Sequence, residues 1–224
     1  MNKQLLKDYI HKSFENSQSQ QTGPVITISR EYGCPGIPVS DGVIAELHKA
    51  GRSVWHKIDR EALNLVADEL QIDPEKVDQV IREKNPGLLS EMMSSFRVHY
   101  VPSDVTIKKK YAAIVTALAR QGHILILGRG AEILAQQIDT ALHVRIIAPR
   151  EWRIRRAMSM HSVNEADAAK LLDTIDRERL YLRHFYSGED LTDYNYDLIL
   201  NAARLPVDAM VQLIVSSLQQ KGMA

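Results

Sequence analysis

Short apolar runs alternate with amphipathic segments along most of this chain. The runs are VITIS (25–29), SVWHKI (53–58), HILILG (123–128), LHVRIIA (142–148) and YDLIL (196–200), of which SVWHKI is the weakest. Such runs, rich in β-branched residues and leucine, are typical of strands that are covered on both faces. The segments between them have the spacing of helices. The pattern therefore predicts an α/β fold in which helices cover both faces of a five-stranded parallel sheet.

The segments outside this alternation divide the chain further. Residues 1–23 are expected to form a short amphipathic helix and a polar linker, and residues 24–221 a single domain. Residues 59–121 contain no strong strand pattern, which predicts a helical excursion from the sheet. The run Lys108–Lys110 within it is interpreted as a solvated helix face, although it could also contact an anion.

The region 149–190 is rich in arginine and is predicted to form two helices. Pro149 stands near the expected start of the first helix. The sequence SVNE, in which Ser162 precedes Glu165 by three residues, predicts a capping box at the start of the second. That helix is expected to end near Tyr186.

Composition narrows the possible functions. The 224 residues are 45% hydrophobic, with 28 basic and 28 acidic side chains, so the formal net charge is zero. The chain lacks the basic excess of a general nucleic-acid or membrane-surface binder. The lone cysteine, Cys34, fits a reducing compartment, and no apolar stretch resembles a signal peptide or a transmembrane helix. We therefore expect a cytoplasmic protein with a small-molecule partner.

The loop after the first strand contains the first candidate chemistry. Gly33 and Gly36 follow the strand, and Pro38 precedes an apolar-periodic helix. Glycines allow backbone N–H groups to turn towards a phosphate, and a helix N-terminus favours negative charge. Neither G-x-x-x-x-G-K-[ST] nor G-x-G-x-x-G is present. The alternative interpretation is a tight strand-to-helix turn.

The motif GRG (128–130) is the second candidate. Arg129 follows the apolar run HILIL, and the carboxyl ends of strands are where open α/β sheets bind ligands. A guanidinium there matches the geometry of a phosphate. A structural ion pair is the alternative.

Arginines on the two helices after residue 149 are the third candidate. The spacing i, i+3, i+7 places Asp176, Arg179 and Arg183 on one face of the second helix. The first helix carries Arg153, Arg155 and Arg156. Phosphoryl transfer depends on arginines that position and neutralise phosphates. A surface lattice of ion pairs would show the same pattern.

The order of these motifs resembles the cytidylate kinase-like family of nucleoside monophosphate kinase relatives, over about residues 24–217. The resemblance is carried by ITISREYGCPG, WHKIDREAL, ILILGRGAEIL, VRIIAPREWRIRRAM, DRERLYLRHFYSGED and YDLILN. It implies a P-loop kinase core with an insertion at 59–121 and an arginine-rich lid at 149–190. ATP with Mg²⁺ would be the donor, and a pyrimidine nucleoside monophosphate the acceptor.

The resemblance also assigns roles to individual residues. It implies that Arg129, Asp176 and Arg179 contact the acceptor, that Arg183 shares their helix face, and that Arg153 and Arg156 lie near the donor phosphates. The loop over the donor phosphates would comprise Gly33, Cys34, Pro35, Gly36, Ile37 and Pro38. No metal-ligating residue is assigned.

Two departures from the family pattern keep other functions open. The loop lacks the lysine of true cytidylate kinases, and Pro35 and Pro38 each lack a backbone N–H. Gly130 stands where those enzymes carry an acceptor-reading aspartate. The alternatives to a nucleoside monophosphate kinase are therefore a non-catalytic nucleotide-binding or regulatory protein and a kinase for a different small acceptor.

Overall fold

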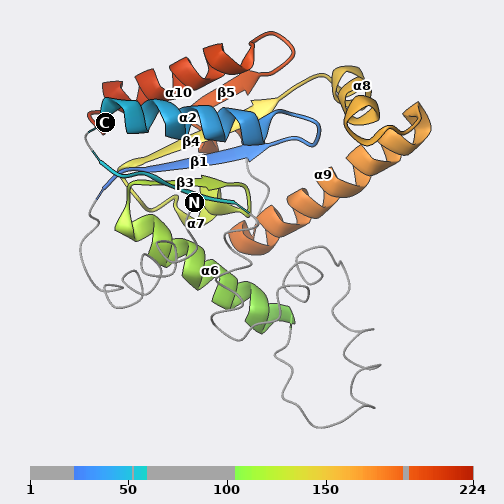
Figure 1. Ribbon diagram of the computed structural model, residues 1–224. Helices are drawn as coiled ribbons and strands as arrows, with labels where there is room; N and C mark the ends of the chain where they lie inside the picture. Colours follow the sequence, from blue (N-terminus) through green and yellow to red (C-terminus); the bar gives the residue numbers. More distant parts are fainter. Residues whose placement is uncertain (1–22, 52, 60–103, 189–191, 224) are drawn as a thin grey trace.

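Five parallel strands form the centre of the computed structural model (Figure 1), which describes residues 23–51, 53–59, 104–188 and 192–223. The strands are β1 (Val25–Arg30), β2 (His56–Ile58), β3 (Ile124–Leu127), β4 (Ala141–Ile147) and β5 (Leu198–Asn201). Their order in the sheet is β2-β3-β1-β4-β5, and every neighbouring pair is parallel. The five strands predicted from the apolar runs are confirmed.

Helices α2 (Gly36–Ala50) and α10 (Val207–Gln220) cover one face of the sheet (Figure 1). Val39, Val43 and Ile214 are fully buried against alternate residues of the strands, such as Ile26 and Leu142. Alternate residues of a strand point to opposite faces, so these contacts use one half of each apolar run.

Helices α6 (Asp104–Gln121) and α7 (Ala131–Leu134) cover the other face. Val115 and Leu118 of α6 pack with Ile124 and Ile126 of β3, and Leu182 joins the same core. Because both faces are covered, the apolar runs are nearly continuous instead of alternating with polar residues.

An arm made of α8 (Arg150–His161) and α9 (Glu165–Ser187) leaves the sheet at the carboxyl ends of the strands (Figure 1). It has a small core of its own, in which Ile154 and Ala157 of α8 pack against Ala168 and Leu172 of α9. A short 3₁₀ helix, η1 (Asp193–Asn195), precedes β5.

The predicted capping box at Ser162 is wrong. Ser162 ends α8 in the left-handed conformation, with φ 54°. The N-cap of α9 is Asn164, whose side chain accepts a hydrogen bond from the N–H of Asp167. Asparagine and serine are both good N-caps, but in the three-residue connection 162–164 it is Asn164 that has the extended conformation of a cap. The predicted end of α9 near Tyr186 is confirmed within one residue.

The helical excursion predicted for 59–121 is tested only in part, because residues 60–103 lie outside the described residues, as does the helix predicted for 2–14. The last part of this segment, α6, lies within the described residues and is helical. Lys108 contradicts the solvated-face interpretation of the lysine run. Its side chain is buried, with Nζ 4.6 Å from the centre of the Tyr181 ring and 4.9 Å from that of Phe185. Cation–π contacts with these two rings of α9 stabilise the buried ammonium group of Lys108, whereas Lys109 is exposed.

Within the part of the chain that the structure describes, no helix combines the length and the apolar character needed to span a membrane.

Candidate functional site

A cavity of about 980 Å³ lies where the carboxyl ends of β1 and β3 meet the inner face of α9. The connections that follow β1 and β3 run in opposite directions across the sheet, since β1 leads to β2 on one side and β3 leads to β4 on the other. Open α/β sheets bind ligands in such a crevice. The cavity is therefore the expected ligand site of this fold.

Three guanidinium groups gather at the floor of this cavity. Arg30 ends β1, Arg129 follows β3 and Arg179 comes from α9, and all three line the cavity. Burial, and then the positive charges of Arg179 and Arg129, lower the pKa of Arg30 to about 9. Burial also lowers the pKa of Arg179, although Asp176 opposes that effect. Cations that depress one another's pKa are stabilised by an anion, and guanidinium groups suit phosphate in particular.

Glycines of two sequence motifs make room for the Arg30 side chain. A Cβ atom at Gly128 would overlap the Nη1 atom of Arg30, and one at Gly36 would lie 3.2 Å from its Cδ atom. Gly130 has a comparable role, because a Cβ there would lie 2.7 Å from the ring of Tyr186. Gly128 and Gly130 also have positive φ angles of 75° and 69°. The GRG motif thus shapes the floor of the cavity and holds Arg129 between its two glycines.

Two polar atoms at the cavity wall make no hydrogen bond within the described residues. They are Oε2 of Glu132, on α7, and Nε of Arg183, on α9, and both are shielded from water. Burial raises the pKa of Glu132, while Arg183 and Arg30 act in the opposite direction. Leaving a buried polar group unpaired costs about 1–3 kcal/mol, and more for a charged one.

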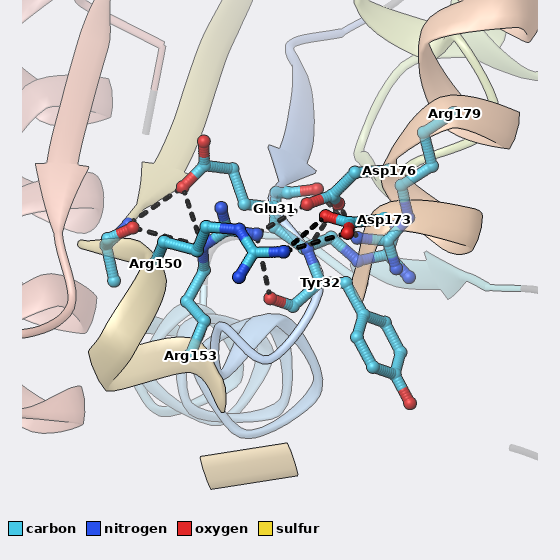
Figure 2. Close-up of polar contacts among 9 residues, drawn as sticks. Glu31, Tyr32, Arg150, Arg153, Asp173, Asp176 and Arg179 are labelled. Carbon is cyan, nitrogen blue, oxygen red and sulfur yellow. Dashed lines mark hydrogen bonds and ion pairs between the residues drawn. The ribbon is translucent and has the colours of Figure 1, made fainter. Parts of the chain in front are cut away.

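The arm is held against the loop after β1 by a network centred on Arg153 and Asp176 (Figure 2). Arg153 Nη1 lies 2.5 Å from Asp176 Oδ2, and its Nε lies 3.3 Å from Glu31 Oε2. Asp176 Oδ1 also accepts a hydrogen bond of 2.7 Å from the backbone N–H of Tyr32. Arg179 Nη1 donates to the carbonyl of Arg30, at 2.9 Å. Asp176 is therefore occupied by the protein itself.

Further contacts extend this network to the outer part of the arm. Arg150 donates two hydrogen bonds of 2.8 Å to Asp173, joining α8 to α9 (Figure 2). The ring of Tyr32 lies between the guanidinium of Arg179, at 5.6 Å, and the ring of His161, at 6.2 Å. The arm thus covers one side of the cavity and contacts both the main chain and a side chain of the loop.

The loop Gly33–Pro38 lies beside the cavity and does not line it. A Cβ at Gly33 would lie 3.0 Å from the carbonyl oxygen of Arg153, so this glycine permits close packing with α8. Cys34 N–H donates to Glu31 and Gly36 N–H donates back to Cys34. Burial raises the pKa of the Cys34 thiol to about 12, which keeps it protonated. Ile37 has an exposed side chain at the start of α2.

The structure thus brings only some of the candidate residues together. Arg129, Asp176, Arg179 and Arg183 line one cavity. Arg153 lies next to it through Asp176, whereas Arg156 stacks on Trp152, with its guanidinium carbon 5.6 Å from the ring centre.

Sequence analysis missed Arg30 and Glu132. Arg30 directly follows the apolar run VITIS, as Arg129 directly follows HILILG, and this parallel could have identified it. Glu132 gave no comparable signal, because a glutamate one turn after a glycine motif is common on helix surfaces.

The residues around the loop fit a nucleotide's phosphates only in part. Gly33 and Ile37 have N–H groups that make no hydrogen bond among the described residues, and α2 offers its N-terminus. Pro35 and Pro38 supply no N–H, and Glu31 and Asp176 are paired with Arg153. No group of side chains with the character of a metal site occurs in the described part of the chain. Mg²⁺ in kinases is held largely by the substrate's phosphates and does not need such a group.

The molecule thus combines a doubly wound parallel sheet, an arginine-lined cavity at its carboxyl edge and a helical arm beside that cavity. A family model for the cytidylate kinase-like family matches residues 25–204. The chain belongs to the cytidylate kinase-like family. The predicted family and the P-loop kinase type of fold are thereby confirmed.

Three further comparisons place the chain among known proteins. A crystal structure of an uncharacterized protein from Eubacterium ventriosum ATCC 27560 is similar over 89% of this chain and 99% of that one, with a TM-score of 0.64 and 18% identity. Shikimate kinase from Bacteroides thetaiotaomicron gives a TM-score of 0.47, with 12% identity over 88% of this chain and 96% of that one. A uronate isomerase from Corynebacterium glutamicum is 31% identical over 98 residues. This match covers 43% of the chain but only 19% of the isomerase.

Proposed function

We propose that the protein transfers a phosphoryl group from ATP to a small phosphorylated acceptor of the nucleoside monophosphate type. The observation that carries this proposal is the group of Arg30, Arg129 and Arg179 at the switch point of the sheet. Three guanidinium groups in one partly enclosed cavity favour a ligand with a phosphate. An acceptor that already carries a phosphate needs no strong general base, since phosphoryl transfer relies on positioning and charge neutralisation.

The donor would bind on the other side of Glu31 and Tyr32, over Gly33–Pro38 and the N-terminus of α2. Mg²⁺ would enter with the nucleotide and neutralise its phosphates. Arg153 lies next to both Gly33 and Asp176, so it links the donor side to the acceptor side. We therefore assign it to the screening of charge between the two substrates.

The test is turnover with a panel of acceptors. Purified protein is incubated with ATP, Mg²⁺ and each of several nucleoside monophosphates, sugar phosphates and shikimate, and ADP formation is measured. The proposal requires ADP formation that depends on a phosphorylated acceptor. The variant Arg155→Gln is a suitable control, because this residue of α8 takes part in none of the site contacts described above.

A second candidate is a nucleotide-binding protein without turnover on the same fold. It is favoured by the loop, where two residues are prolines and both glycines are explained by packing against Arg153 and Arg30. Calorimetry separates the two functions. Nucleotide binding without ADP formation from any acceptor would support the second function and refute the first.

A further inference from the structure

The cavity contains a pair of polar atoms that the proposed phosphate-binding role does not use. Glu132 Oε2 can accept a hydrogen bond, and Arg183 Nε–H can donate one, yet neither has a partner within the described residues. Both residues line the same cavity as the three guanidinium groups. A ligand group that satisfies both atoms must donate a hydrogen bond to Glu132 Oε2 and accept one from Arg183 Nε–H.

A hydroxyl group meets both requirements. A hydroxyl can donate one hydrogen bond and accept another, whereas a phosphate dianion only accepts and an ammonium group only donates. Ser29 acts on the carboxyl group of Glu132 and favours its charged form, and the Nη1 atom of Arg183 donates to the hydroxyl of Tyr196 at 3.3 Å. The two side chains are therefore held by β1 and by the segment before β5, which leaves Oε2 and Nε for a ligand.

The charges along the cavity give the ligand an orientation. Arg30 lies close enough to Glu132, Arg129 and Arg179 for each to influence its pKa. A phosphate would be attracted to the side of Arg129 and Arg179 and repelled from the carboxylate of Glu132. The phosphate is therefore favoured near Arg129 and Arg179 rather than beside Glu132.

Asp176, which the resemblance assigned to the acceptor, already has partners within the protein. Asp176 accepts a hydrogen bond from Tyr32 N–H and pairs with Arg153. Glu132 is the carboxylate in the described cavity lining that is fully buried and still has an oxygen without a partner.

We propose that Glu132, together with Arg183, is a specificity-determining residue that binds a hydroxyl group of the phosphorylated acceptor, as found on a ribose or another sugar. Glu132 Oε2 accepts from the hydroxyl, and Arg183 Nε–H donates to it. Because both atoms are shielded from water in the structure, the ligand reaches them through a rotation of the long Arg183 side chain. This proposal rests on the acceptor site of the proposed function but not on turnover.

Calorimetry with matched ligands tests the proposal without any kinase assay. The probes are CMP, 2′,3′-dideoxycytidine monophosphate, ribose 5-phosphate and inorganic phosphate. The wild-type protein is expected to bind CMP at least about tenfold more tightly than the dideoxy compound, since a site built for a hydroxyl rejects an analogue that lacks it. Ribose 5-phosphate distinguishes a free sugar phosphate from a nucleotide as the source of the hydroxyl.

The variant Glu132→Gln then links the ligand's hydroxyl groups to this side chain. It is expected to weaken CMP binding by about tenfold and to reduce the gap between CMP and its dideoxy analogue to about twofold or less. Inorganic phosphate should bind the variant as tightly as the wild type, or more tightly, because a negative charge near the arginines has been removed. The matched control Glu151→Gln removes the same charge from an exposed position on α8 and should alter neither affinity.

The outcomes separate a binding role from a structural one. Equal loss of CMP and phosphate binding in Glu132→Gln would mean that the residue only maintains the fold, and would overturn the proposal. Two results with the wild type would overturn it as well: equal affinity for CMP and the dideoxy analogue, or failure to bind CMP and ribose 5-phosphate. Neither result requires that the variant folds. If the affinities for CMP, its dideoxy analogue and phosphate are as expected but no ADP forms, the hydroxyl site is supported and only the kinase function is refuted.

Discussion

Replacing Gly128 with alanine tests whether the GRG motif exists to accommodate Arg30. The added Cβ would overlap Arg30 Nη1, and φ at this position is 75°. A residue other than glycine in the left-handed region costs roughly 1–2 kcal/mol. The overlapping atom is the end of a flexible side chain, so the guanidinium will move and the backbone will stay. We expect a small further loss of stability and a large loss of anion binding.

The expected loss of binding follows from the hydrogen bonds that Arg30 would make. A hydrogen bond to a charged group contributes about 1.5–3 kcal/mol, and each 1.4 kcal/mol changes affinity about tenfold. Displacing Arg30 should therefore weaken inorganic phosphate binding by at least about tenfold, measured by calorimetry. Guanidinium-chloride unfolding of the same samples should show a stability loss of about 1–2 kcal/mol.

Gly51→Ala is the matched control, because Gly51 has a similar φ of 69° and the nearest atom to an added Cβ is 4.0 Å away. This variant should lose as much stability as Gly128→Ala but keep wild-type phosphate affinity. If Gly128→Ala binds phosphate as the wild type does, Arg30 is not part of the anion site and our account of the motif is wrong.

Three other predictions concern single side chains. Arg129→Ala should weaken binding of CMP and of inorganic phosphate by about tenfold in calorimetry; unchanged affinity for both would remove Arg129 from the acceptor site. Because the pKa of Arg30 is lowered to about 9, phosphate affinity should fall as the pH rises through about 9, and Arg30→Met should bind weakly and show no such fall. Burial lowers the pKa of His143, whose Nδ1 lies 2.8 Å from Thr27 Oγ1, below the ordinary value of 6.5. As the pH falls through 6.5, this histidine therefore takes up a proton more readily in the unfolded chain than in the folded protein. The free energy of unfolding should therefore decrease as the pH falls from about 7.5 to about 5.5, and the decrease should be larger in the wild type than in His143→Gln.

The sheet could be predicted from sequence because burial on both faces leaves a direct trace in it. Strands such as β3, with four fully or nearly fully buried residues, must be continuously apolar. Arg129 was predicted for a related reason, since its place is fixed by the strand before it. The helix face with Asp176, Arg179 and Arg183 follows from helical periodicity alone.

The parts that failed depend on contacts between distant segments. Lys108 is buried because Tyr181 and Phe185 of α9 face it across more than 70 positions of sequence. The choice of Asn164 over Ser162 as N-cap depends on where α8 ends. Gly36 also leaves room for the side chain of Arg30, a contact that the sequence analysis did not predict. No local pattern distinguishes a glycine that admits a ligand from one that admits a side chain.

The separate core of the arm bears on how the arm is attached to the rest of the molecule. Ile154, Ala157, Ala168 and Leu172 hold α8 and α9 together without help from the sheet. Lifting the outer part of the arm from the loop therefore breaks polar contacts, chiefly those of Arg153, Asp176 and Arg179. Such polar contacts contribute about 0.5–1.5 kcal/mol each, or somewhat more where charged. Near the other end of α9, Leu182 is buried in the core that it shares with α6 and β3. The arm therefore has two kinds of attachment, a polar one to the loop after β1 and an apolar one to the core beside the sheet.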